Sequence, residues 1–202
     1  TYGAEHNDIA SVYNNIGVTY SAKEDYDKAL EFYEKALAIQ LKTLGPEHPT
    51  VATTYNNFGV VYTYKGDSDL AFKYYDKSLG IRSKRLDPEH PDMAQSYRNL
   101  AETFSQKRDC EQAVAFYQKT IGILRKVFGP EHNEVLLVYH AMGMMHMKME
   151  EHGDAIQAFR ICLEIKLKTL GPWHPDLIGS HVNIAAASFL KKDYAQSIEH
   201  NR

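Results

Sequence analysis

Gly45-Pro46-Glu47-His48-Pro49 is the stretch that decides the fold, because related stretches follow it at a fixed interval. Its counterparts begin at Asp87, Gly129 and Gly171, each 42 residues after the one before, and residues 3–7 complete the series at the N-terminal edge. Such a period is typical of a solenoid, in which small units stack because none can bury its own apolar face alone. We therefore predict a single array over residues 1–202, with repeats at about 3–44, 45–86, 87–128 and 129–170 and a partial repeat at 171–202.

Composition narrows the classes of partner. The 202 residues are 44% hydrophobic and carry a net charge of −3, which gives no broad field that would recruit nucleic acid or anionic lipid. No apolar run approaches the roughly 18 to 20 residues that span a bilayer. We therefore expect no nucleic-acid and no membrane partner. The two cysteines, Cys110 and Cys162, lack metal-ligand spacing, which favours a reducing, cytoplasmic setting.

Each repeat is predicted to hold two helices. Proline after the histidine forbids helix continuation from upstream and so separates one repeat from the next. Acidic or hydroxyl side chains near the start of the first helix can accept its free N–H groups. The residues expected there are Asp8, Thr50, Asp92, Glu134 and Asp176. The second helix has its own start signal in Asp25, Asp67, Asp109, Glu151 and Asp193.

One column of small residues lies in the middle of the first helices. It consists of Gly17, Gly59, Ala101, Gly143 and Ala185. Glycine inside a helix costs about 0.5 to 1 kcal/mol relative to alanine, so its return indicates a close approach between helices. Large aromatic residues flank the column at helical spacing, which predicts interior packing. The aromatic columns are Tyr13, Tyr55, Tyr97 and Tyr139; Tyr20, Tyr62 and Phe104; and Tyr33, Tyr75, Tyr117 and Phe159.

These positions carry a family resemblance. Tyr13, Ile16-Gly17, Tyr20, Ala29 and Tyr33, with their counterparts one period on, resemble the signature of the tetratricopeptide repeat (TPR). The 42-residue unit looks like a lengthened form of the usual repeat and is similar to the repeats of kinesin light chains. The resemblance implies an all-α solenoid of antiparallel helix pairs wound as a right-handed superhelix. It also implies that first helices line a concave groove in which an extended peptide lies.

By that match, the inward stripe of the first repeat comprises Ser11, Asn14, Asn15, Val18 and Ser21. Its most regular member is an asparagine ladder, Asn15, Asn57, Asn99 and Asn183, interrupted by Ala141. An amide offers both donors and an acceptor, so a row of amides can bind the backbone of an extended peptide of any sequence. The alternative is that asparagine simply marks a tolerated polar position of the repeat.

Selectivity is expected from the neighbouring residues that differ between copies, namely Asn14, Asn56, Arg98, His140 and Val182. Arg98 could pair with an acidic side chain or a carboxylate, although an exposed arginine is as often a solvated charge. Met144 and Met147 make the later copies of the stripe apolar, which suits a hydrophobic part of a partner. For Met144 and Phe189, burial between stacked helices is the competing explanation.

Catalytic and metal sites are not predicted. Five of the ten histidines recur once per repeat in the connector, too far apart to share one ion, and are expected to cap or brace it. His140, His146 and His152 stand six residues apart and so point to different helix faces. Phosphate-binding loops, nucleophile elbows and paired catalytic carboxylates are also missing from the sequence. We therefore expect neither an enzyme nor a cofactor.

The leading functional hypothesis is a non-catalytic scaffold that binds a linear partner peptide, similar to cargo recognition by kinesin light chains. A carboxylate clamp is disfavoured because only Arg98 and Lys148 lie in suitable columns. The alternative is a structural, self-association or sensor module of a larger signalling or ciliary protein. Self-association would use open repeat ends, since solenoid ends without a polar cap expose apolar surface.

Overall fold

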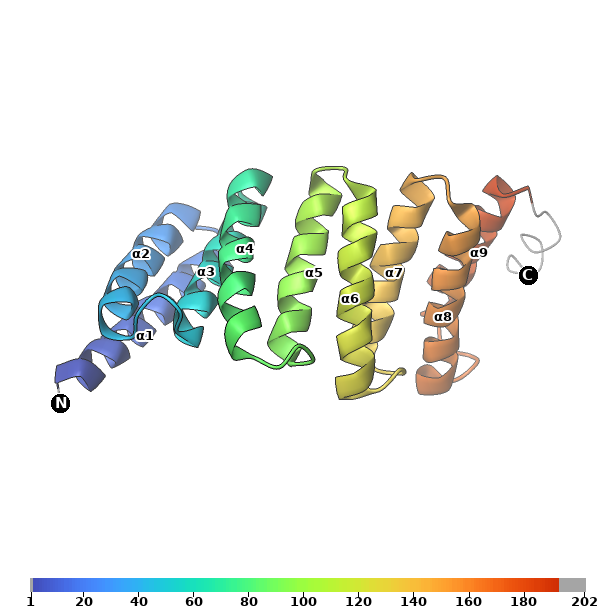
Figure 1. The fold of residues 1–202 in the computed structure, drawn as a ribbon. Helices are drawn as coiled ribbons and strands as arrows, with labels where there is room; N and C mark the ends of the chain where they lie inside the picture. Colours follow the sequence, from blue (N-terminus) through green and yellow to red (C-terminus); the bar gives the residue numbers. More distant parts are fainter. Residues whose placement is uncertain (1, 193–202) are drawn as a thin grey trace. The chain divides into compact units, whose positions relative to one another are not determined.

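The computed structural model describes residues 2–192, and every regular element in that range is an α-helix (Figure 1). The helices are α1 (Tyr2–Ala22), α2 (Tyr26–Thr43), α3 (Pro49–Tyr64), α4 (Ser68–Arg85), α5 (Pro91–Gln106), α6 (Cys110–Phe128), α7 (Asn133–Lys148), α8 (His152–Leu170) and α9 (Leu177–Leu190). The predicted all-α fold class is confirmed over this range. The expected helix start at Asp193 lies outside the described residues.

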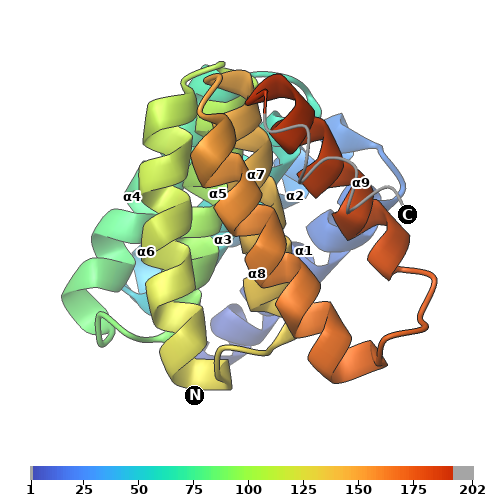
Figure 2. The ribbon, with the colours of Figure 1, turned by 90° about the vertical axis from the view of Figure 1, so that its right-hand side faces the viewer.

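The chain divides into two compact units, unit 1 (Thr1–Pro88) and unit 2 (Glu89–Arg202). In unit 1, α1 packs against α2, α3 packs against α4, and α2 and α3 join the two pairs. In unit 2, each of α5 to α8 packs against the next helix along the chain (Figures 1 and 2). Each unit is therefore built from helix pairs that bury their apolar faces against neighbouring pairs.

The connector histidines cap the first helices of the repeats. The Nδ1 atoms of His48, His90 and His132 accept the backbone N–H two residues further on, at 3.2, 3.1 and 3.2 Å. Each of these histidines is the N-cap residue of its helix. The capping role expected for the histidines is confirmed for these three. The expectation that Thr50, Asp92 and Glu134 cap with their side chains is wrong, because they supply the N–H groups that the imidazoles accept.

The first and last copies of the connector differ from the others. Helix α1 runs from Tyr2 through residues 3–7, so Asp8 lies inside the helix and is not its cap. The sequence explains the difference, because Ala4 and Asn7 stand where connector prolines would interrupt the helix. In the last copy, His174 Nδ1 still accepts the backbone N–H of Asp176, at 3.2 Å, but α9 begins only at Leu177, so Asp176 is its N-cap residue and makes no side-chain capping bond.

The second helices begin where the sequence predicted. The carboxylates of Asp25, Asp67 and Asp109 accept backbone N–H groups in the first turn, at 3.4, 3.0 and 3.1 Å. Glu151 occupies the same position before α8 but makes no side-chain capping bond. The fourth repeat (residues 129–170), called copy four below, thus keeps the start of its second helix but lacks the side-chain cap.

The glycine column makes room for aromatic rings. A Cβ at Gly59 would lie 2.5 Å from the ring of Tyr75, and a Cβ at Gly17 would lie 2.5 Å from the ring of Tyr33. The expected close approach is confirmed, but the glycines accommodate a side chain and not a second backbone. Tyr75 is only 3% exposed, so this packing belongs to the core.

Candidate functional site

Two members of the asparagine ladder bond to the preceding repeat. In unit 1, the Nδ2 group of Asn57 on α3 donates to Oδ1 of Asn14 on α1, at 3.0 Å. In unit 2, Asn183 on α9 lies 3.1 Å from the Nε2 atom of His140 on α7. Both pairs join residues 43 positions apart. The ladder amides therefore help to hold neighbouring first helices together, a role that single-repeat reasoning missed.

The remaining ladder positions differ in exposure. Asn15 is exposed, whereas Asn99 is 6% exposed; Asn56, in the neighbouring column, is half-buried. The Oδ1 atom of Asn99 accepts a hydrogen bond from Nε2 of Gln95, one turn earlier on α5, at 2.7 Å. Asn15 thus offers the freest amide to a ligand, and Asn99 the most enclosed one.

Arg98 already has acidic partners inside unit 2. Its Nη1 atom lies 2.7 Å from Glu134 on α7, and its Nε atom lies 3.2 Å from Glu102 on the same helix. The side chain is 30% exposed, so one edge remains open. Arg98 stands one period before His140, but the ladder position that would face it is Ala141. Its guanidinium reaches a glutamate instead of an asparagine amide. An acidic ligand group would have to compete with Glu134 for this cation.

Unit 1 has a pocket of about 370 Å³ on the face that carries Asn57. Val18 of α1 and Val60 of α3 supply apolar walls, and Tyr26 of α2 and Tyr64 of α3 contribute rings. These two rings stack with centroids 6.0 Å apart, and Tyr64 is 67% exposed. Glu24, in the turn between α1 and α2, is the single charged residue of the lining. The pocket is therefore lined by apolar and aromatic side chains together with the polar Ser21 and Asn57 and one carboxylate.

The corresponding face of unit 2 is apolar. Met144 and Leu137 on α7 are each 41% exposed, and Phe189 on α9 is 60% exposed. Burial between stacked helices is therefore ruled out for Met144 and Phe189. Met147 differs, because it is partly buried against the core cluster that contains Phe159. The two units thus present different surfaces on equivalent helices.

His140 has the most distinctive titration on this face. Its ring lies 5.8 Å from that of Phe159, centroid to centroid. Desolvation lowers the pKa of His140 below its ordinary value, and the nearby Lys166 ammonium lowers it further. The neutral imidazole is therefore favoured, and in its tautomer with the proton on Nδ1 the Nε2 atom accepts the Asn183 amide hydrogen.

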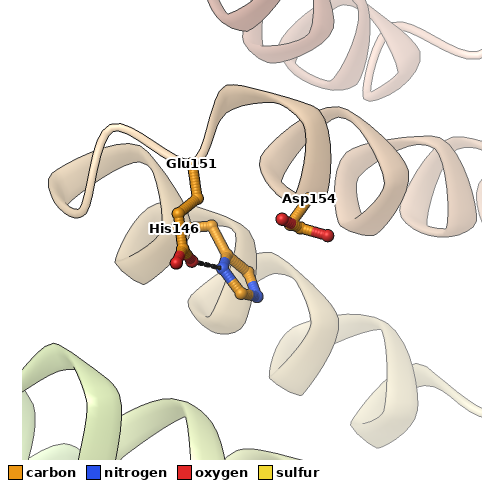
Figure 3. Close-up of side chains that lie close together, drawn as sticks. All are labelled: His146, Glu151 and Asp154. Atoms are coloured by element: carbon orange, nitrogen blue, oxygen red, sulfur yellow. Dashed lines mark hydrogen bonds and ion pairs between the residues drawn. The ribbon is translucent and has the colours of Figure 1, made fainter.

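A second cluster lies at the turn between α7 and α8. The Nδ1 atom of His146 lies 2.7 Å from a carboxylate oxygen of Glu151, and Asp154 follows in the first turn of α8 (Figure 3). One potential ligand atom from each residue lies within 4.8 Å of the others. Spacing along the chain relates the histidines only to one another and gives no sign of the carboxylates that the turn brings to His146.

Comparisons with known proteins agree with the fold. The model of the tetratricopeptide repeat family matches residues 8–84, 50–126 and 109–168. The chain is similar to the TPR-like repeats assigned to a kinesin light chain of Podosopora anserina, at 23% identity and a TM-score of 0.82, covering 96% of this chain and 92% of that one. BtubC (BKLC) of P. vanneervenii follows at 21% identity, TM-score 0.81 and coverage of 96% and 78%. No curated protein matches the sequence significantly.

These comparisons set the general class of the protein. TPR repeats generally serve as non-catalytic scaffolds that mediate protein–protein interactions. No helix within residues 2–192 combines the length and apolar character needed to cross a membrane. The matched segments together run from residue 8 to residue 168, and the chain belongs to the tetratricopeptide repeat family.

Proposed function

We propose that this protein is a non-catalytic interaction module that holds an extended segment of a partner protein against its first helices. The unit 1 pocket carries the proposal, because it is a hollow in the face that the family resemblance assigns to peptide binding. Asn15, Asn56 and Asn57 lie on or beside this face and would bond the peptide backbone. In unit 2, the partner segment would be contacted by Arg98, Asn99, His140, Met144, Met147 and Asn183.

The lining of the pocket favours one class of side chain. A lysine or arginine of the partner could lay its aliphatic stem on Val18 and Val60 and bring its cation to Glu24 and the ring of Tyr64. The chain uses this chemistry on itself, since Lys77 Nζ lies 5.1 Å from the ring centre of Tyr55. We therefore propose a basic side chain as the anchor in unit 1. The apolar face around Met144 would accept a hydrophobic part of the partner.

The proposed setting is the cytoplasm, and the proposed role resembles the recognition of cargo or adaptor proteins by kinesin light chains. No catalytic step, nucleic acid or lipid is part of it. A second candidate is a structural or self-association module, favoured by the bonds of Asn57 to Asn14 and of Asn183 to His140. In that case the asparagine ladder would only hold neighbouring repeats together and would not bind a peptide.

A peptide library screened against the whole chain tests the proposal. Selected peptides should share a basic residue, and Tyr64→Ala and Glu24→Gln should each weaken their binding by at least about tenfold, since hot-spot truncations typically cost 2 kcal/mol or more. Glu31→Gln, which removes the same charge from the exposed pair with Lys35 on α2, is the matched control and should change nothing. Circular dichroism should show unchanged helicity in all three variants.

Undiminished binding by Tyr64→Ala would sink the pocket proposal. If no peptide binds and the chain instead forms a concentration-dependent oligomer in analytical ultracentrifugation, the structural candidate is preferred.

A further inference from the structure

The four described turns between paired helices share one backbone geometry. The N–H groups of Asp25, Asp67, Asp109 and Glu151 each donate to the carbonyl five residues earlier, at 3.0, 2.9, 2.9 and 2.9 Å. The residue before each of them has a positive φ, from 60° at Glu150 to 77° at Gly66. The side chains at this corner can therefore be compared directly between copies, because the backbone that carries them is the same.

Copies one to three fill the corner with packing and capping residues. Tyr20, Tyr62 and Phe104 end the first helices and stack on an aromatic ring of the second, with centroids 5.4 to 5.5 Å apart. An aspartate then caps the second helix. Three residues after that cap stand Lys28, Leu70 and Gln112, which have no common chemistry.

Copy four is the only one of the four described copies with a metal-ligand residue type at all three positions, because two positions change to such a type and the third keeps a carboxylate. His146 replaces the aromatic residue, Glu151 replaces the capping aspartate, and Asp154 takes the third position. Ala158 occupies the place of the stacking partner, so the aromatic pair is lost. An aromatic pair contributes about 0.5–1.5 kcal/mol and an N-cap about 1 kcal/mol. Copy four gives up both contributions at one corner, and such local departures concentrate at functional sites.

The geometry of the three side chains suits a single ion. His146 comes from the last turn of α7 and is 12% exposed, whereas Glu151 and Asp154 start α8 and are open to solvent. In a tetrahedral site, ligand atoms about 2.0–2.2 Å from the ion lie about 3.3–3.6 Å apart. The observed separations, all within 4.8 Å, reach this range by rotation of the two exposed carboxylates. Figure 3 shows the three side chains at this corner, with Glu151 already turned to the imidazole.

We propose that His146, Glu151 and Asp154 bind a divalent transition metal ion of the zinc class, which ties the end of α7 to the start of α8. One imidazole and two carboxylates provide three ligands, and water completes the coordination. A cation beside Asp154 opposes the ion, because the Lys191 ammonium lies 3.7 Å from where a Cβ of the neighbouring Gly153 would stand. Binding is accordingly of moderate strength and strengthens when this charge is removed.

Zinc titration of the whole chain by calorimetry tests the proposal. One site is expected, with Asp154→Asn and His146→Phe each weakening it by at least about tenfold. His146→Phe restores the residue type of copy three, so it is not expected to damage the fold, and circular dichroism verifies this. Glu150→Gln removes one charge from the same turn without touching a ligand and is expected to change the affinity less than twofold.

Cobalt gives a second readout, because its visible absorption reports coordination by nitrogen and oxygen and should vanish in His146→Phe. Lys191→Gln should tighten zinc binding. The proposal is overturned if the unaltered chain binds no zinc at submillimolar concentration, or if Asp154→Asn and His146→Phe bind zinc as tightly as the unaltered chain does. In the latter case the ion belongs to other histidines of the chain.

Discussion

The same inter-repeat contact is made with different chemistry in the two units. In unit 1, Asn57 and Asn14 form a half-buried amide pair, whereas in unit 2 Asn183 meets the exposed imidazole of His140. The neighbouring surfaces differ as well, with tyrosines and a carboxylate around the unit 1 pocket and methionine and leucine on α7. The backbone repeat therefore sets where contacts form, and the residues of each copy set their strength, pH dependence and ligand.

The largest expected effect comes from the glycine column. Gly59→Ala places a methyl group 2.5 Å from the ring of Tyr75 and should destabilise unit 1 by about 1–3 kcal/mol, as overpacking does. In unit 2 the same column already holds Ala101, which is fully buried. Ala101→Gly should cost only about 0.5–1 kcal/mol through helix propensity. Urea unfolding of both variants measures the difference, and equal costs would show that the two units pack this column alike.

Removing one amide from each pair should reveal a smaller difference in stability between the two units. Asn57→Ala leaves the half-buried Oδ1 atom of Asn14 without its amide donor and should cost about 1 kcal/mol. Asn183→Ala leaves His140 open to water and should cost a few tenths of that. Thermal unfolding followed by circular dichroism compares the two. A larger loss in Asn183→Ala would contradict the assignment of the stronger contact to unit 1.

The smallest effect is the pH dependence that His140 gives to unit 2. Folding lowers the pKa of His140 below its ordinary value. At high pH the imidazole is neutral in both the folded and the unfolded chain. As pH falls through the unfolded value of about 6.5, the unfolded chain takes up the proton first and the folded state loses stability until its own pKa is passed. His140→Asn recreates the amide pair of unit 1 and should flatten this part of the curve. The free energy of unfolding of the unaltered chain and of His140→Asn is measured from neutral to mildly acidic pH. The same slope in both proteins would show that His140 is not responsible.

Much of the fold could be predicted from the sequence, because its causes are local and recur. The period, the prolines and the aspartates mark helix starts within a few residues of chain, and the aromatic columns follow helical spacing. The connector histidines were expected to cap, and His48, His90 and His132 do so, whereas His6 lies inside α1. The expectation failed at Thr50, Asp92 and Glu134 although their side chains are of types that commonly cap helices. Each stands two residues after a histidine whose imidazole accepts its backbone N–H and so takes the capping role.

The site was less predictable, since its contacts join residues from different repeats. Asn57 bonds to Asn14 across 43 residues, and Arg98 reaches Glu134 across 36. His146 needed the turn before α8 to bring Glu151 to it. A column comparison shows which positions vary, but it does not give the direction in which each side chain points.

By itself, the sequence determined the repeat, the helix pairs and the positions of their caps, because backbone hydrogen bonding and proline stereochemistry act over a few neighbouring residues. Only the tertiary structure decided that ladder amides pair within each unit, that tyrosines and Glu24 enclose a pocket, and that three ligand-type residues meet at one corner. It also placed the boundary between the units in the connector where Asp87 replaces the glycine. These features depend on side chains from separate helices, whose distances are set when the helices pack.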